Sequence, residues 1–137
     1  MKTILVGFDG SEPSERALAR SAEIAKAFGG AVHVASVAPV LVGTGRSMGP
    51  YDPTDTPAEH AEQIDRALAS LAEAGIQASP APAHGDPADV ILELADRVDA
   101  DLVVLGSHER SLIERALGMS VNGAVSRKAH RDVLIVH

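Results

Sequence analysis

Short apolar runs alternate with longer segments of helical periodicity, and this alternation constrains the fold more than any other feature of the sequence. Each run has the length of a buried strand, and each intervening segment carries one apolar stripe at helical spacing. Strands joined by such helices form right-handed βαβ units, whose parallel sheet needs helices on both faces. The sequence therefore predicts an α/β, Rossmann-like domain with five parallel strands. The predicted strands are residues 3–8, 31–37, 76–83, 102–105 and 133–136. A helix is expected between each pair of successive strands, and the last of these helices at 120–129.

Two prolines in the third run determine its place in the sheet. Pro80 and Pro82 remove N–H groups on the same side of the strand, which only a sheet edge tolerates. The expected order is then 3-2-1-4-5, which reverses between the first and fourth strands. Ligands of open α/β sheets bind at such a reversal, outside the carboxyl ends of the strands. The residues expected there are Asp9, Val37, Gly106 and Ser107.

The segment after the fourth strand adds features that suit an anion. Gly118 precedes Ser120 and a helical pattern that includes Val121. A serine at a helix start caps a backbone N–H, and the remaining N–H groups there suit a phosphate. Residues 103–137 contain five Lys/Arg and three Asp/Glu, whereas residues 1–102 contain 7 and 16, so an anion is repelled least in this segment. The alternative is that Gly106 only ends a strand and Ser120 only caps a helix.

These residues resemble the C-terminal signature of the universal stress protein family. The signature reads Gly, two residues, Gly, nine residues, Gly, Ser or Thr, then Val. The first Gly, the Ser and the Val match here, whereas two glycine positions hold other residues and Gly118 lies one position early. The resemblance covers nearly the whole chain, including residues 4–11 and 84–88, and implies one universal stress protein domain over 1–137. The residues in the signature frame are Gly106, Glu109, Met119, Ser120 and Val121.

The resemblance implies the order 3-2-1-4-5, the adenine nucleotide α-hydrolase-like fold, and an adenine nucleotide (ATP or AMP, with or without Mg²⁺) at the switch between strands one and four. Asp9 would lie beside the adenosine, and the backbone of Val37 would meet the adenine edge. Glycines would let the backbone approach the ribose and phosphates, and Ser120 with the Val121 N–H would bind phosphate. Glu109 and Met119 at glycine positions predict micromolar rather than nanomolar affinity. The implied binding residues are Asp9, Val37, Gly106, Ser107, His108, Gly118, Met119, Ser120 and Val121.

Composition argues against several other functions. Cysteine is absent, so disulfides and thiolate metal sites are ruled out, and a net charge of −7 argues against general nucleic-acid binding. No apolar run approaches about 18 residues, and no basic, hydrophobic leader opens the sequence, so we expect no membrane span and no secretion signal. The absence of cysteine fits a cytoplasmic location. The six histidines show no metal-ligand spacing, and no nucleophile elbow is present, so no metal ligand or catalytic residue is assigned.

Two further features of the sequence bear on binding and assembly. Residues 38–56 are irregular and rich in glycine and proline, which fits either a flexible loop or a loop that grips phosphate. The last run, from Val133 to Val136, leaves an apolar sheet edge, which predicts a homodimer through that strand.

The expected function is that of a cytoplasmic, homodimeric stress-response module that binds an adenine nucleotide. Two alternatives stay open. One is a family member that binds no nucleotide and acts through protein–protein contacts. The other is a slow ATPase or a protein that phosphorylates itself at Ser120 or a neighbouring hydroxyl.

Overall fold

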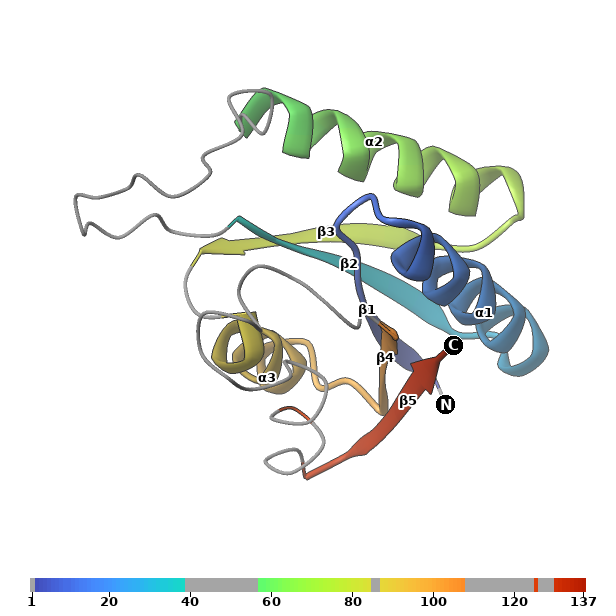
Figure 1. The fold of residues 1–137 in the computed structure, drawn as a ribbon. Coiled ribbons are helices and arrows are strands. Elements are labelled where there is room, and N and C mark those ends of the chain that lie inside the picture. Colours follow the sequence, from blue (N-terminus) through green and yellow to red (C-terminus); the bar gives the residue numbers. More distant parts are fainter. Residues whose placement is uncertain (1, 39–56, 85–86, 108–124, 126–129) are drawn as a thin grey trace.

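A computed structural model describes residues 2–38, 57–84, 87–107, 125 and 130–137. Within these residues, five strands form one sheet in the order β3-β2-β1-β4-β5, and every neighbouring pair is parallel (Figure 1). The predicted fold class and strand order are therefore confirmed. The strands are β1 (Thr3–Gly7), β2 (Ala31–Ala38), β3 (Ala78–His84), β4 (Leu102–Gly106) and β5 (Asp132–Val136).

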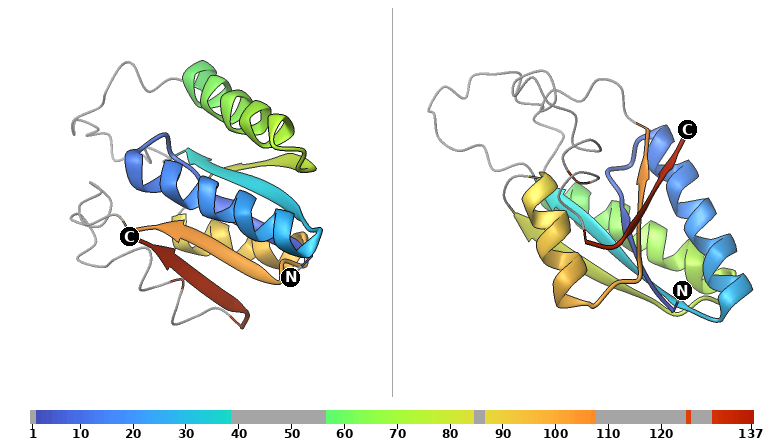
Figure 2. Two further views of the ribbon diagram at one scale, coloured as in Figure 1. Left: turned by 90° about the vertical axis from the view of Figure 1, so that its right-hand side faces the viewer. Right: turned by 90° about the horizontal axis from the view of Figure 1, so that it is seen from below.

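Helices cover both faces of this sheet. On one face lie α1 (Glu12–Phe28) and α2 (Pro57–Glu73), and on the other lies α3 (Pro87–Arg97), as Figure 2 shows. The helix expected at 120–129 falls outside the described residues except for Val125, which is helical and fully buried on the α3 side. Of the helices that the structure describes, none is long and apolar enough to cross a membrane.

The core is aliphatic and divided by the sheet into two layers. In β1, Ile4 and Val6 pack on the side of α1 and α2, while Leu5 packs on the side of α3, and all three side chains are fully buried. The neighbouring β4 repeats this alternation with Val104 on the first side and Val103 on the second. Because both faces are covered, each central strand reads as a continuous apolar run.

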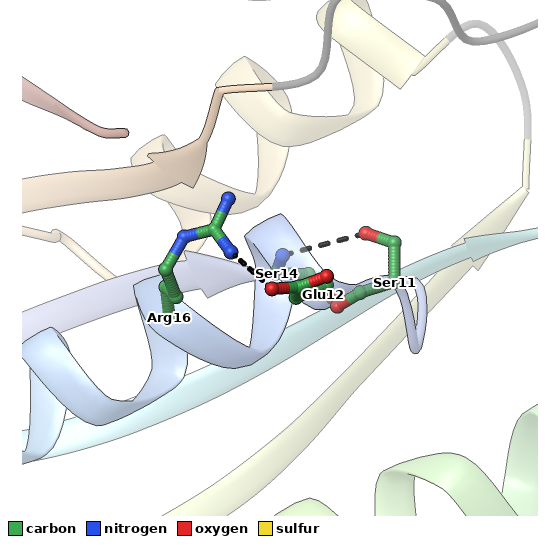
Figure 3. A network of polar contacts seen from close by, with 4 residues as sticks. All are labelled: Ser11, Glu12, Ser14 and Arg16. Atoms are coloured by element: carbon green, nitrogen blue, oxygen red, sulfur yellow. Dashed lines mark hydrogen bonds and ion pairs between the residues drawn. The ribbon is translucent and has the colours of Figure 1, made fainter.

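Helix α1 has well-defined caps at both ends. Ser11 has the extended backbone of an N-cap (φ −76°, ψ 162°), and its hydroxyl accepts a hydrogen bond from the Ser14 N–H at 3.3 Å (Figure 3). Pro13 lies in the first turn, where its missing N–H is not needed. At the other end Gly29 is left-handed (φ 67°), and its N–H donates to the carbonyl of Ala25. The Ser11 cap therefore fixes where the helix begins, beside the carboxyl end of β1, and Gly29 fixes where it ends.

Asp101 ties the start of β1 to the start of β4. Its Oδ2 atom accepts hydrogen bonds from the backbone N–H groups of Lys2 at 2.9 Å and Thr3 at 3.0 Å. Hydrogen bonds to the charged form favour it, so the bond from Thr3, followed by that from Lys2, lowers the pKa of Asp101. This carboxylate therefore aligns the two central strands at their amino ends.

Arg131 links β5 to the end of α3. Its guanidinium donates to the carbonyls of Ala95, at 2.9 Å, and Ala100, and forms a 2.7 Å ion pair with Asp96. The side chain is only 19% exposed. One planar group thus joins the last turn of α3, where the Ala95 carbonyl also accepts the Ala100 N–H, to the residues between α3 and β4.

The third strand begins later than the sequence indicated. Residues 76–83 were the expected strand, whereas β3 covers Ala78–His84. Gly75 is left-handed (φ 78°), and the buried Ile76 donates its N–H to the carbonyl of Leu71, so Ile76 belongs to the C-terminal cap of α2. The edge position predicted from Pro80 and Pro82 is confirmed.

Candidate functional site

The two halves of the sheet separate at the point where the strand order reverses. Residue pairing between β1 and β4 ends at Val6 and Val104. Beyond it, β1 stays with β2, because Phe8 donates its N–H to Ala35 at 2.8 Å. In the same way β4 stays with β5, because Ser107 donates to Val136 at 2.8 Å. The backbones therefore diverge at the carboxyl edge. We call this gap between the strand ends the crevice, and ligands bind at such a point in open α/β sheets.

On the β1 side of this crevice, Asp9 forms a turn that is held by side chains. Its Oδ1 atom accepts hydrogen bonds from the Ser11 N–H, at 2.9 Å, and from the Ser11 hydroxyl. Its own N–H donates to the Ser14 hydroxyl at 3.3 Å. Gly10 between them is left-handed, with φ 81°. Asp9 is exposed, so an acceptor group is fixed at the rim of the crevice.

On the β4 side, Gly106 lies directly against the first turn of α1. A Cβ atom at this position would come within 2.4 Å of the carbonyl carbon and oxygen of Pro13. A side chain is therefore excluded by the backbone of α1, and φ at Gly106 is not positive. The sequence suggested a strand-ending turn or a close approach to a ligand, and it carried no signal for this helix contact.

The structure brings several of the predicted site residues to this edge. Asp9 and Ser107 follow the two strands that diverge, and Gly106 ends β4. Val37 lies near the carboxyl end of β2, paired with Ala83 of β3, and so one strand further along the same edge. The remaining predicted positions lie outside the described residues: His108, Gly118, Met119, Ser120 and Val121, with Glu109 and the loop 39–56.

The described residues do not form a metal centre. Within them, no group of three or more His, Asp or Glu side chains is placed to hold an ion. Of the predicted site residues that the structure describes, the edge offers backbone groups, the Asp9 carboxylate and the Ser107 hydroxyl for binding through hydrogen bonds.

A doubly wound parallel sheet with a crevice at its switch point places this chain among the Rossmann-like α/β proteins. The model of the universal stress protein family matches residues 1–137, and the chain belongs to that family. A universal stress protein of Mycobacterium tuberculosis is 36% identical over 141 residues, which cover 99% of this chain and 96% of that protein.

Two solved structures with bound nucleotides are similar to this chain. A universal stress protein in complex with cAMP is 33% identical, with a TM-score of 0.75 and coverage of 99% of this chain and 96% of that one. The universal stress protein from Archaeoglobus fulgidus in complex with dAMP is 27% identical, with a TM-score of 0.74 and coverage of 100% and 98%. Both relatives share the fold over their whole lengths.

Proposed function

We propose that this universal stress protein is a cytoplasmic, homodimeric regulatory module that binds an adenine nucleotide in the crevice between β1 and β4. The divergence of the two strands at Asp9 and Ser107 carries the proposal, because it creates an open edge at the switch point. The complexes of two relatives with cAMP and dAMP support an adenine ring, a sugar and one phosphate as the shared ligand chemistry. AMP has the same three parts, and ATP carries two further phosphates.

Each part of the nucleotide has a proposed partner. The carboxylate of Asp9 accepts hydrogen bonds from the adenosine, and the backbone of Val37 meets the adenine edge. Phosphate is bound by Ser120 and by the N–H of Val121, at the start of the helix expected there. The remaining proposed binding residues lie where the backbone would approach the ribose and the phosphates: Gly106, Ser107, His108, Gly118 and Met119.

Calorimetry tests this assignment on the full chain. We expect micromolar affinity for ATP, AMP or cAMP, each titrated with and without Mg²⁺. Ser120→Ala removes a hydrogen bond to a charged group and should weaken binding by about 10- to 100-fold. Ser126→Ala is the matched control, because it lies further along the same expected helix and should leave affinity unchanged.

Three outcomes separate the alternatives. If no adenine nucleotide gives heat with the wild type, the nucleotide proposal fails and a role through protein contacts replaces it. Equal affinities of the two serine variants would remove Ser120 from the site while leaving binding intact. Slow phosphate release that disappears in Ser120→Ala would assign the ATPase activity.

The proposed dimer pairs two copies of β5. Within the described part of the chain this strand has a neighbour on one side only, and its residues Val133, Leu134 and Ile135 are half-buried. A twofold contact would cover both apolar edges at once. Val133→Lys should give a monomer by light scattering at micromolar concentration, whereas Ser79→Lys on the opposite edge should not. A wild-type monomer contradicts the proposal, and melting curves check that both variants fold.

A further inference from the structure

Ser11 connects the first turn of α1 to the carboxylate of Asp9, which is the proposed acceptor for the adenosine. An N-cap residue needs its side chain only as an acceptor, and the Ser11 hydroxyl oxygen accepts the Ser14 N–H at 3.3 Å (Figure 3). The proton of the same hydroxyl is donated to Asp9 Oδ1, and the Ser11 N–H donates to this oxygen at 2.9 Å. One residue therefore holds one carboxylate oxygen with two donors, which the capping role does not require.

These bonds bear on binding because Asp9 is exposed. An exposed side chain exchanges between rotamers, and a ligand that binds it has to immobilise it at a cost in conformational entropy. A carboxylate that the protein already holds avoids this cost, and hydrogen bonds to a charged acceptor are strong enough to hold it. An ionised carboxylate has about four acceptor sites, so the two bonds from Ser11 do not exhaust its capacity.

The turn that carries Ser11 is itself fixed from the opposite side of the crevice. Ser14 is buried, donates its hydroxyl to the Ser11 carbonyl at 2.9 Å and accepts the Asp9 N–H at 3.3 Å. Pro13, between the two serines, lies so close to Gly106 of β4 that a side chain is excluded there. The first turn of α1 thus touches both sides of the crevice, and it sets the position of Asp9 relative to the end of β4.

We propose that Ser11 is a positioning residue of the nucleotide site, which holds the Asp9 carboxylate in place for the adenosine before a ligand binds. Ser11 acts through Asp9 and does not itself contact the nucleotide. This inference rests on the proposed function, because it assigns Ser11 a part in that binding. The competing explanation is that Ser11 serves only as the cap of α1, and the two explanations differ in what happens when the Asp9 carboxylate is absent.

A double-mutant cycle separates the two roles, with AMP titrated into the ¹⁵N-labelled full chain and affinity taken from saturable amide shifts. Ser11→Gly removes the hydroxyl and keeps the backbone N–H, and glycine caps a helix nearly as well as serine. We expect this variant to bind AMP about two- to tenfold more weakly, while its urea midpoint changes little. In an Asp9→Ala background the same substitution should leave affinity unchanged, because the side chain that Ser11 positions is gone.

Two further variants complete the test. Ser11→Thr retains the hydroxyl and should restore affinity, whereas Ser21→Ala removes a buried hydroxyl that bonds to the Ala17 carbonyl further along α1 and should not alter it. The inference is overturned if Ser11→Gly binds AMP as tightly as the wild type, or if it weakens binding equally with and without the Asp9 carboxylate. Either result leaves wild-type binding, and so the proposed function, intact. A wild type that binds no adenine nucleotide overturns both.

Discussion

Replacing Gly106 by alanine should disturb both the stability of the protein and the edge that carries the proposed nucleotide site. The new Cβ atom would lie 2.4 Å from the carbonyl carbon and oxygen of Pro13 and 2.9 Å from its Cβ atom. Ordinary van der Waals contact begins at 3.4 Å. The first turn of α1 and the end of β4 must therefore separate by about 1 Å.

The size of the effect follows from what has to move. Pro13 meets the new methyl group with backbone atoms, which no side-chain rotation can withdraw. Overpacking of a core typically costs about 1–3 kcal/mol, and the rigid neighbour places this substitution near the upper end. The same movement shifts Ser11 and Ser14, which hold Asp9 in its turn. We therefore expect a loss of stability of about 2–3 kcal/mol and weaker nucleotide binding.

Urea unfolding measures this loss, and two other glycines provide controls. At Gly7 a Cβ atom would meet the end of the Leu105 side chain at 2.9 Å, which can rotate, so Gly7→Ala should cost about 1 kcal/mol. At Gly29 nothing lies within 4 Å, so Gly29→Ala tests only the strain of positive φ, about 1–2 kcal/mol. Gly106→Ala should lower the urea midpoint most, by about 1 M. A midpoint no lower than that of Gly7→Ala would refute the reasoning about the α1 contact.

Three further predictions concern single side chains. The hydrogen bonds from the Thr3 and Lys2 N–H groups hold the pKa of Asp101 below its ordinary value, so the stability that this carboxylate contributes is present above the ordinary pKa of an aspartate and is lost as the pH falls through the folded-state pKa; the stability difference between the wild type and Asp101→Asn should vanish in acid titrations. Arg131→Lys cannot reproduce the planar fork and should cost about 1–2 kcal/mol in urea unfolding, whereas an unchanged midpoint would contradict the role of the guanidinium. Glu109→Gly and Met119→Gly restore the signature glycines and should each tighten ATP binding in calorimetry; unchanged affinity in both would remove the proposed repulsion and strain.

The fold could be predicted from the sequence because its determinants are local and repeated. The apolar runs, the helical stripes and the prolines at 80 and 82 each act through backbone hydrogen bonding or periodic burial. Prediction was weaker where an element ends, because ends depend on contacts with other elements. Ile76 is apolar and precedes β3, yet its N–H closes the cap of α2.

The location of the candidate site was predictable for the same reason, whereas the contacts within it were not. The order of the strands fixes where the crevice opens, and Asp9 and Ser107 follow from the strand ends. Asp9 bonding to Ser11, and the Gln63 amide resting against Gly10, depend on how α1 and α2 settle on the sheet. The first contact is local in the chain, whereas the second joins residues far apart, and no spacing in the sequence records it.

Gly106 shows why the first glycine of the signature is a poor indicator of nucleotide binding. Its contact with Pro13 requires glycine for the packing of α1 on β4, whatever the crevice holds. A family member without a nucleotide would need the same residue for the same reason. The residues that distinguish a binding protein from a non-binding one are therefore to be sought at other positions of the signature. Ser120, Glu109 and Met119 are the residues to test, and the order of their effects on ATP affinity decides between the two functions.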